Sequence, residues 1–465
     1  MNLEKGSINK KKIFLSGIAG TGMSSLAGLF SELGYDVSGS DINFYPPVDT
    51  ILKNLDIKIF NSFNEDNIPP DVMLCVIGNI ISRGNPEAEY ILNNKLEYLS
   101  MAEALYRYFI KKKRSVVVAG THGKTTISSF VSFLFNNAGL KPGYFIGGKP
   151  ENLGSNFSTG EGGEYFISEG DEYETSFFDR SSKFLKYFPE LLILTALEYD
   201  HIDYFRSEED YIYAFSNLVN QVPSKGLIIS NSDYGMNNRV TEKSLTKVLT
   251  YGEKDADYLI SEIIPDKTGY GFTLKYKGEK MVFRSNLMGR FDIWNITAGV
   301  IAGISAGIRL QVIKDSVSSF KGVERRLNKL AEIKNTIIFE DFAHHPTSIG
   351  AVLKSIRELF PKRRIITFLE PGSWSLKNKF FENKLIKSIS YSNEIYIKYP
   401  ERFGKVPESS RIDFERIKKV AVKSGKKAEL FYDIAGFKDL LNRIDMSEDQ
   451  IIMVLSNGRF DGLST

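Results

Sequence analysis

A glycine-rich stretch at residues 119–126 combines the residue types that bind phosphate groups. It follows a β-branched run at 115–118 and opens a segment with apolar residues at helical spacing. The backbone N–H groups of such a turn, together with the ammonium of Lys124, can hold β- and γ-phosphates. The Thr125 hydroxyl is then placed to ligate Mg²⁺. The expected nucleotide contacts are Gly120, Thr121, Gly123, Lys124, Thr125 and Thr126; an ordinary strand-to-helix turn is the alternative.

Two clusters of acidic residues each follow an apolar, strand-like run. The first, at 169–172, comes after 165–167, and the second, at 198–203, comes after 191–197. Parallel α/β sheets gather ligands at the carboxyl ends of their strands, so both clusters can reach the site that holds Lys124. Mg²⁺ prefers oxygen ligands and would offset the repulsion among the acids. Helix capping is the alternative role for three residues: Asp171, Asp200 and Asp203.

A second glycine-rich turn lies near the N-terminus. Gly20 and Gly22 stand between an expected strand at 12–16 and an expected helix at 24–33, and a second strand ends at Asp41. This is a Rossmann arrangement, in which the glycines admit a diphosphate and the acidic residue binds a ribose or base. The final glycine of the dinucleotide pattern is replaced by serine, so NAD binding does not follow automatically.

Length and composition limit the class of protein. A chain of 465 residues exceeds what one hydrophobic core supports, so two or three domains are expected. Sixty basic residues nearly balance 57 acidic ones, and we expect no nucleic-acid partner. No apolar run approaches the roughly 20 residues of a membrane helix. The single cysteine, Cys75, lies in an apolar run and suggests a reducing compartment, so the protein is expected to be cytoplasmic.

Segments between these motifs indicate how the chain is organised. Residues 100–114 end in a run of basic residues and are interpreted as an exposed helix and linker. Residues 220–285 alternate short strand-like runs with Gly and Asp turns, and we expect them to complete the sheet that carries the phosphate loop. A new strand and helix series then starts at 337–340.

Several motifs resemble those of one enzyme family. The run Ala-Gly-Thr-His-Gly-Lys-Thr-Thr at 119–126 is similar to the ATP loop of the Mur ligases, which build the peptide of bacterial cell-wall precursors. The N-terminal glycine-rich turn, with Gly20 and Gly22, is similar to the loop that holds the diphosphate of a UDP-sugar in these enzymes. Segments 41–47 and 78–87 resemble the branch that joins a recycled peptide to UDP-N-acetylmuramate. The resemblance implies ATP and Mg²⁺ as cofactors.

The resemblance also implies an α/β fold of three domains. These are a Rossmann-like UDP-sugar domain at 1–107, a central P-loop ATPase-like domain at 108–321 and a Rossmann-like C-terminal ligase domain at 322–465. Carried over residue by residue, it makes Lys124, Glu169 and His201 catalytic and assigns Mg²⁺ to Thr125, Glu169 and His201. For the UDP-sugar it suggests Gly20, Gly22, Asp41, Arg83 and Asn85. A solvated loop is the alternative for Arg83 and Asn85.

In the last third of the chain, the resemblance assigns further residues and shows two departures. Nucleotide contacts are expected from Asn295, Arg326 and Asp341, and substrate contacts from His344, Ser456 and Asn457. Arg326 is alternatively a surface charge, and His345 before Pro346 is expected to start a helix. Phe291 and Asp292 replace the family's His-Asn pair on the adenine side, and Gly372 replaces an arginine suited to a peptide carboxylate.

The function expected from this resemblance is ATP-dependent amide ligation. The lactyl carboxylate of UDP-N-acetylmuramate would be joined to L-Ala-γ-D-Glu-meso-diaminopimelate through an acyl phosphate, by a monomer or weak homodimer. Ligation to L-alanine alone is the nearest alternative. A nucleotide-binding protein that has lost catalysis and an NAD-dependent oxidoreductase are alternatives from other classes.

Overall fold

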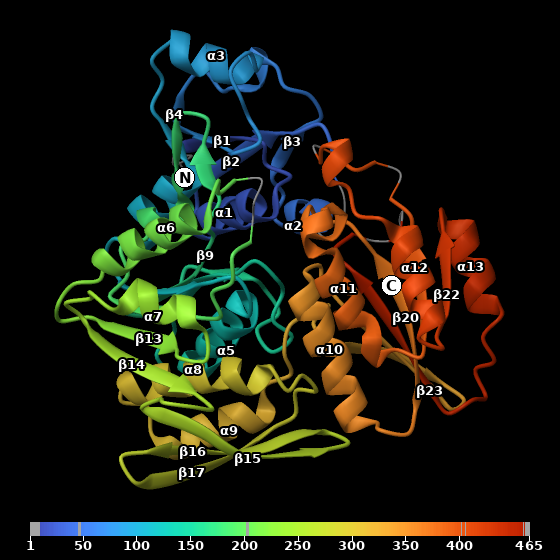
Figure 1. Cartoon of the computed structure of the whole chain (residues 1–465). Helices are drawn as coiled ribbons and strands as arrows, with labels where there is room; N and C mark the ends of the chain where they lie inside the picture. Colours follow the sequence, from blue (N-terminus) through green and yellow to red (C-terminus); the bar gives the residue numbers. More distant parts are fainter. Residues whose placement is uncertain are drawn as a thin grey trace, which may run out of the picture.

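The computed structural model describes residues 10–44, 48–200, 204–400, 402–404, 406–458 and 460. Within them, three β-sheets covered by helices follow one another along the chain, as the blue, green-to-yellow and orange-to-red parts of Figure 1 show. We call these parts the first unit (residues 12–110), the middle unit (114–319) and the third unit (324–460). The predicted α/β fold of three units is confirmed. The domain limits at 107/108 and 321/322 stay predictions.

The first unit is a five-stranded parallel sheet in the order β3-β2-β1-β4-β5. The expected strands at 12–16 and 36–40 are present, whereas the first helix begins at Thr21, three residues before the expected 24. The strands are β1 (Lys12–Ser16), β2 (Asp36–Ser40), β3 (Lys58–Phe60), β4 (Val72–Ile77) and β5 (Tyr98–Ser100), and the helices α1 (Thr21–Glu32), α2 (Val48–Asn54), α3 (Pro86–Asn93) and α4 (Met101–Leu105).

The middle unit contains a ten-stranded sheet in the order β17-β16-β15-β14-β13-β12-β6-β9-β7-β8, and residues 220–285 complete it as predicted. The strands are β6 (Arg114–Ala119), β7 (Gly143–Phe145), β8 (Phe157–Ser158), β9 (Tyr165–Gly170), β12 (Leu191–Leu194), β13 (Leu227–Asn231), β14 (Lys247–Gly252), β15 (Tyr258–Asp266), β16 (Gly269–Tyr276) and β17 (Glu279–Ser285). The helices are α5 (Lys124–Asn137), α6 (Glu208–Asn220), α7 (Gly235–Thr241), α8 (Asp292–Ser305) and α9 (Leu310–Ser319), and β10 (Glu174–Ser176) pairs separately with β11 (Asp179–Ser182).

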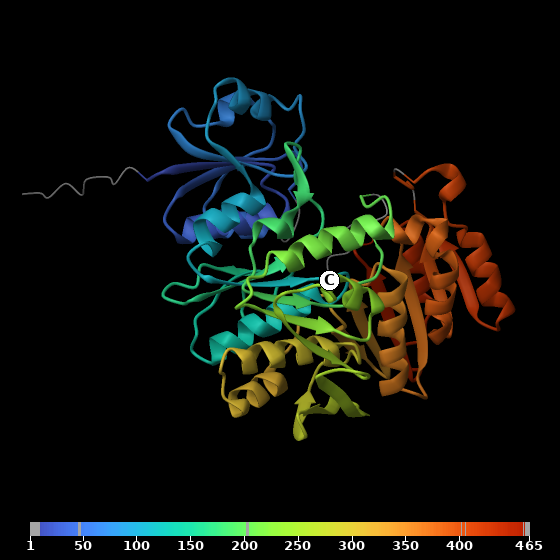
Figure 2. The same cartoon turned by 60° about the vertical axis from the view of Figure 1, so that its left-hand side comes forward.

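The third unit is a six-stranded sheet in the order β18-β19-β23-β20-β21-β22, in which only the β18–β19 pair is antiparallel. Its strands are β18 (Asn328–Ile333), β19 (Thr336–Asp341), β20 (Arg364–Glu370), β21 (Glu394–Lys398), β22 (Lys427–Phe431) and β23 (Gln450–Ser456). Its helices are α10 (Pro346–Leu359), α11 (Glu382–Ser388), α12 (Phe414–Lys423) and α13 (Ile434–Asn442). In the view of Figure 2 this unit lies beside the middle unit.

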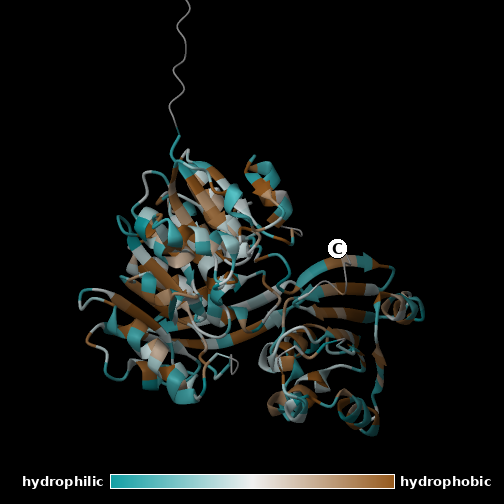
Figure 3. Ribbon diagram, turned by 90° about the horizontal axis from the view of Figure 1, so that it is seen from above, coloured by the Kyte–Doolittle hydropathy of each residue, from teal (hydrophilic) through white to brown (hydrophobic). Residues whose placement is uncertain are grey.

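The central strands are apolar throughout because both faces of the sheet are covered. Val116 and Val118 of β6 pack into the cluster that contains α5 and α8, whereas Val117 faces the cluster that contains α6. Buried parallel strands therefore show continuous apolar runs and not alternation. Figure 3 shows hydrophobic residues within the strands of the sheets.

Residues 100–114 do not form the exposed helix that the basic run suggested. α4 continues into a π-helical turn at 106–110, and Ala102, Leu105, Phe109 and Ile110 are buried. The exposed residues of the segment are Arg107, Lys111, Lys112 and Arg114. Among the described residues, no helix combines the length and apolar character needed to cross a bilayer.

The first and middle units share one apolar cluster, whereas most of the third unit's buried apolar residues form two clusters of their own. The shared cluster includes the contact of α1 with the β7–β8 hairpin. A Cβ atom placed on Gly28 of α1 would lie 2.2 Å from Cζ of Phe157. Beside it, Asn156 Nδ2 donates to Ser25 Oγ at 2.8 Å. The small residue at 28 thus sets how closely the two units approach.

A Gly28→Ala substitution is expected to lower the melting temperature by several degrees. Overpacking a close contact costs about 1–3 kcal/mol, more than the helix propensity that alanine gains. Gly235→Ala on α7, where a Cβ would meet nothing within 4 Å, is the matched control and should not lower it. Thermal unfolding followed by circular dichroism tests this, and equal melting temperatures for both variants would contradict it.

Candidate functional site

The phosphate loop is a tight turn that only glycine permits at two positions. Gly120 has φ of 139° and Gly123 has φ of 85°, both in the region that other residues rarely adopt. Both are also closely packed, since a Cβ on Gly120 would stand 2.0 Å from Thr195 Oγ1 and one on Gly123 2.3 Å from Asn295 Oδ1. The turn therefore delivers Lys124 to the first position of α5, at the carboxyl end of β6.

Lys124 is held at this loop by a carboxylate that the sequence pattern did not single out. Its Nζ donates to the Gly120 carbonyl at 2.6 Å and to Glu172 Oε2 at 2.8 Å, and Glu172 is only 1% exposed. Burial by itself lowers the pKa of Lys124, but Glu172 outweighs this effect and raises the pKa above its ordinary value. The ammonium is therefore charged and fixed in direction.

Two of the three expected metal ligands lie side by side. Thr125 Oγ1 donates to Glu169 Oε1 at 3.0 Å, and the other oxygen of Glu169 accepts from Gly147 N–H at 2.8 Å. A hydroxyl and a carboxylate at this spacing suit a small oxygen-preferring cation next to a phosphate loop. His201, the third expected ligand, lies outside the described residues.

Two other loop residues point into the protein. The Thr121 hydroxyl donates to the Glu198 carbonyl at 2.9 Å and lies 2.7 Å from the Tyr211 hydroxyl, while its backbone N–H donates to the Ala196 carbonyl. Thr126 is buried in the first turn of α5. Thr121 thus holds the loop onto the strand end that follows β12.

A second group of predicted residues meets where the middle and third units join. Asn295 Nδ2 donates to Asp292 Oδ1 at 2.9 Å, and the Arg326 guanidinium lies 5.1 Å from the centre of the Phe342 ring. The Asp341 carboxylate accepts from the backbone N–H groups of Leu327 and Ala343, both at 2.7 Å.

Burial raises the pKa of Asp292 to about 7, against the opposing hydrogen bond from Asn295. The nearby Asp341 adds to the rise and has a raised pKa itself, chiefly through burial. The chain therefore has a buried acid next to the phosphate loop that holds its proton more tightly than an ordinary carboxyl group does.

The predicted substrate residues of the third unit lie at the carboxyl ends of its strands. The His344 carbonyl accepts from Ser373 Oγ at 2.5 Å, and burial lowers the pKa of His344 to about 4. Ser456 Oγ donates to Glu370 at the end of β20. Asn457 Oδ1 is buried and has no hydrogen-bond partner among the described residues.

Asn457 also occupies the space beside Gly372, the glycine that stands in place of an arginine. A Cβ at position 372 would lie 2.0 Å from Asn457 Oδ1. The amide of Asn457 thus occupies the space that the first side-chain atoms of a larger residue at 372 would need.

In the first unit, the glycine turn and Asp41 come together. The Asp41 carboxylate, 4% exposed, accepts from Ala19 N–H at 3.0 Å and Ile42 N–H at 2.8 Å. Gly20 is the residue before α1, so the turn opens at a helix N-terminus. Gly22 lies in the first turn of α1, where a Cβ would meet the Met101 sulfur at 2.7 Å.

Arg83 and Asn85 occupy the loop before α3. The Asn85 side chain caps α3 and accepts from the backbone N–H groups of Glu87 and Ala88. Arg83 is 69% exposed and pairs with Glu89 at 2.9 Å. The Asn-Pro-Glu run at 85–87 was a capping signal in the sequence, because asparagine before a proline at the first helical position is a preferred start. His345 likewise caps α10, which confirms the predicted helix start.

Comparison with known proteins identifies the family. The model of the Mur ligase family, catalytic domain, matches residues 12–113, and that of the Mur ligase middle domain matches 118–303. A UDP-N-acetylmuramate–L-alanyl-γ-D-glutamyl-meso-2,6-diaminoheptanedioate ligase of Haemophilus influenzae is 31% identical over 85% of this chain and 87% of its own length. A UDP-N-acetylmuramate–L-alanine ligase of Aquifex aeolicus is 32% identical over 82% of each chain.

The crystal structure of a murein peptide ligase from Psychrobacter arcticus is similar along 97% of both chains, with 26% identity and a TM-score of 0.70. The chain belongs to the Mur ligase family. Members of this family are ATP-dependent amide ligases, so the protein is an enzyme that forms C–N bonds.

Replacing Asp292 by asparagine is expected to stabilise the protein at high pH. The folded-state pKa of about 7 lies above the unfolded value of about 4, so Asp292 destabilises the fold progressively as pH rises between them. The gain from Asp292→Asn should be on the order of 2 kcal/mol at pH 8 and shrink toward pH 5.

Scanning fluorimetry at the two pH values measures this difference. Asp36→Asn, which changes an exposed carboxylate at the start of β2, is the control and should leave the melting temperature unchanged at both. A gain for Asp292→Asn of equal size at pH 5 and pH 8 would refute the raised pKa.

Proposed function

We propose that this chain joins the lactyl carboxylate of UDP-N-acetylmuramate to the α-amine of L-Ala-γ-D-Glu-meso-diaminopimelate, using ATP and Mg²⁺. The observation that carries the proposal is the juxtaposition of Lys124, Thr125 and Glu169 at the carboxyl edge of the middle sheet. The name of the Haemophilus influenzae relative specifies this peptide ligation, and the Psychrobacter arcticus structure is that of a murein peptide ligase; both support the choice of substrates.

The residues of the middle unit suit ATP and Mg²⁺. Thr125 and Glu169 would hold the cation, with His201 as the proposed third ligand. Lys124 is charged and directed into the loop by Glu172, so it can bind a transferring phosphoryl group. A bare carboxylate is a poor acceptor for an amine, and ATP supplies the phosphoryl group that activates it.

The other units supply the two substrates. We assign the diphosphate and uridine to Gly20, Gly22 and Asp41, with Arg83 and Asn85 on the loop facing the sugar. In the last part of the chain, we assign nucleotide contacts to Asn295, Arg326 and Asp341 and peptide contacts to His344, Ser456 and Asn457.

The competing function is ligation of UDP-N-acetylmuramate to L-alanine. The Aquifex aeolicus relative with this name is as similar to the chain as the peptide ligases are, so identity alone does not separate them. In addition, Gly372 removes a cation that would suit a peptide carboxylate.

Phosphate release with Mg²⁺, ATP and UDP-N-acetylmuramate, measured for each amine in turn, decides between these functions. We expect kcat/KM to be at least about tenfold higher for the tripeptide than for L-alanine, because the pocket gains the binding energy of two further residues. A preference for L-alanine would establish the competing function. Release with neither amine would overturn both.

A Lys124→Ala variant is expected to lose at least about a hundredfold in kcat, because a preorganised charge on the phosphoryl group is removed. Its affinity for UDP-N-acetylmuramate, measured by calorimetry, should stay within about twofold of the wild-type value, since that substrate binds in the first unit. Lys225→Ala, an exposed lysine before β13, should retain full activity. Unchanged turnover of Lys124→Ala would exclude the assigned role.

A further inference from the structure

Glu198 lies between the phosphate loop and the third unit and contacts both. It follows β12 in the middle unit, and its side chain is 24% exposed. One carboxylate oxygen is 3.0 Å from Nε2 of His122, which belongs to the phosphate loop. The other accepts from Nζ of Lys384 on α11 at 2.7 Å. The carboxylate of Glu198 thus connects the phosphate loop with α11, which lies in another unit of the chain.

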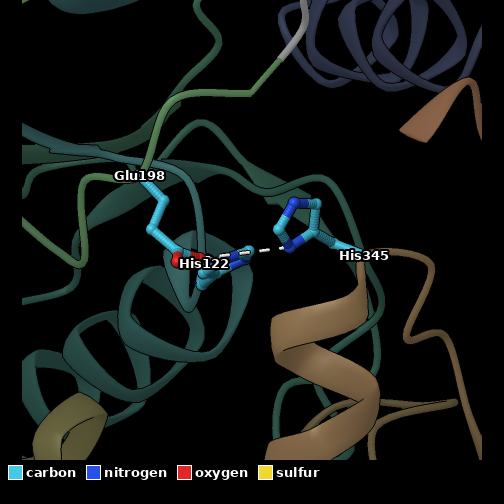
Figure 4. Close-up of side chains that lie close together, drawn as sticks. All are labelled: His122, Glu198 and His345. Atoms are coloured by element: carbon cyan, nitrogen blue, oxygen red, sulfur yellow. Dashed lines mark hydrogen bonds and ion pairs between the residues drawn. The ribbon is translucent and has the colours of Figure 1, made fainter. Parts of the chain in front are cut away.

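The start of α10 reaches the same place from the third unit. Figure 4 shows the His345 ring directed toward His122 and Glu198, with its Nδ1 4.0 Å from Glu198 Oε2. The two histidine rings are 5.2 Å apart, and Ser348 Oγ lies 3.3 Å from His122 Nδ1. Both nitrogens of His122 therefore have partners, one in each unit.

The charges at this junction balance without a bound metal ion. His122, Glu198 and His345 place three potential ligand atoms within 4.8 Å of one another. Lys384, however, already brings a positive charge to the carboxylate. Burial alone would raise the pKa of Glu198, but the hydrogen bonds from His122 and Lys384 hold it well below its usual range. Glu198 is thus an anion whose partners come from two units.

We propose that Glu198 is a positioning residue that holds the third unit against the phosphate loop through His122 and Lys384. This inference rests on the proposed function, because the third unit carries residues assigned to nucleotide and peptide, such as Arg326 and His344. These residues can act on a nucleotide at Lys124 only while the third unit is docked. The contact is therefore expected to affect turnover more than nucleotide affinity.

A second polar contact between the middle and third units limits how far docking can weaken when Lys384 is changed. Ser375 Oγ, on the loop before α11, donates to Asp200 Oδ1 at 2.8 Å in a buried position. It joins the third unit to the same strand end and stays intact when Lys384 is changed. Because the Lys384 side chain is also 43% exposed, losing its ion pair should weaken docking without abolishing it.

Lys384→Met is the test variant, since it keeps the length of the side chain and removes its charge. We expect kcat for ATP-dependent phosphate release to fall about fivefold, while the Kd of a fluorescent ATP analogue stays within about twofold. Lys384→Arg should restore most of kcat. The control is Lys387→Met, one turn further along α11, because Lys387 is exposed and forms no ion pair within the described part of the chain.

A double-mutant cycle asks whether the two residues act through one contact. Glu198→Gln should lower kcat, and adding Lys384→Met should lower it little further, because the interaction is already lost. Raising the ionic strength should reduce kcat of the wild type toward that of Lys384→Met and change the variant less. Independent effects of the two substitutions would refute the shared contact.

X-ray scattering provides a readout that does not depend on turnover. With the ATP analogue bound, Lys384→Met should have a larger radius of gyration than the wild type or Lys387→Met. Unchanged scattering together with unchanged kcat would overturn the inference, and so would a loss of nucleotide affinity in parallel with kcat. If the wild type itself releases no phosphate with either amine, the proposed function fails, whereas the scattering comparison still decides the role of Glu198.

Discussion

The turn between β6 and α5 is the constraint on which the site depends. Two glycines with positive φ let the chain reverse within four residues, and each is in such close contact that no Cβ fits. Their neighbours, Thr195 and Asn295, belong to the strand end after β12 and to α8. The loop therefore cannot move independently of the sheet and helix around it. This rigidity fixes the direction of Lys124 and the spacing of Thr125 from Glu169.

Around this turn, charged side chains lie in compensated pairs. Lys124 is matched by the buried Glu172, and Glu198 is matched by His122 and the partly exposed Lys384. Removing Glu172 would leave a charge that has lost its solvation, which costs more than the pair contributes, whereas Lys384 can lose its pair at a smaller cost. Asp292 is different, because burial and a neighbouring acid raise its pKa to about 7. The surroundings of Asp292 thus oppose a negative charge, whereas those of Glu172 and Glu198 support one.

The sequence predicted those parts of the structure that depend on local patterns. Apolar runs located the central strands, and glycines with Lys-Thr located the phosphate loop. The basic residues at 111–114 suggested an exposed helix, yet the apolar residues before them are buried in the cluster that the first and middle units share. A run of charged residues at the end of a segment does not indicate whether the residues before it are exposed or buried.

The candidate site was predicted less completely for a related reason. Lys124, Thr125 and Glu169 lie in recognisable motifs, whereas the contacts of Glu172, Glu198 and Lys384 join residues far apart in the chain. The acidic clusters predicted that Glu172 and Glu198 lie near the phosphate loop, but not which partners they contact, since these pairs arise from how the units pack. Asn85 shows the opposite case, because its helix-capping role can be read locally from the proline that follows it.

The close approach of Gly372 and Asn457 restricts how this enzyme can change over evolutionary time. Any residue larger than glycine at 372 collides with the amide of Asn457 unless that side chain first swings away or is replaced. A larger side chain at 372 is therefore accommodated most easily once Asn457 has moved or been replaced by a smaller residue. The contact makes the two positions interdependent, so substitutions at 372 and 457 are expected to occur together.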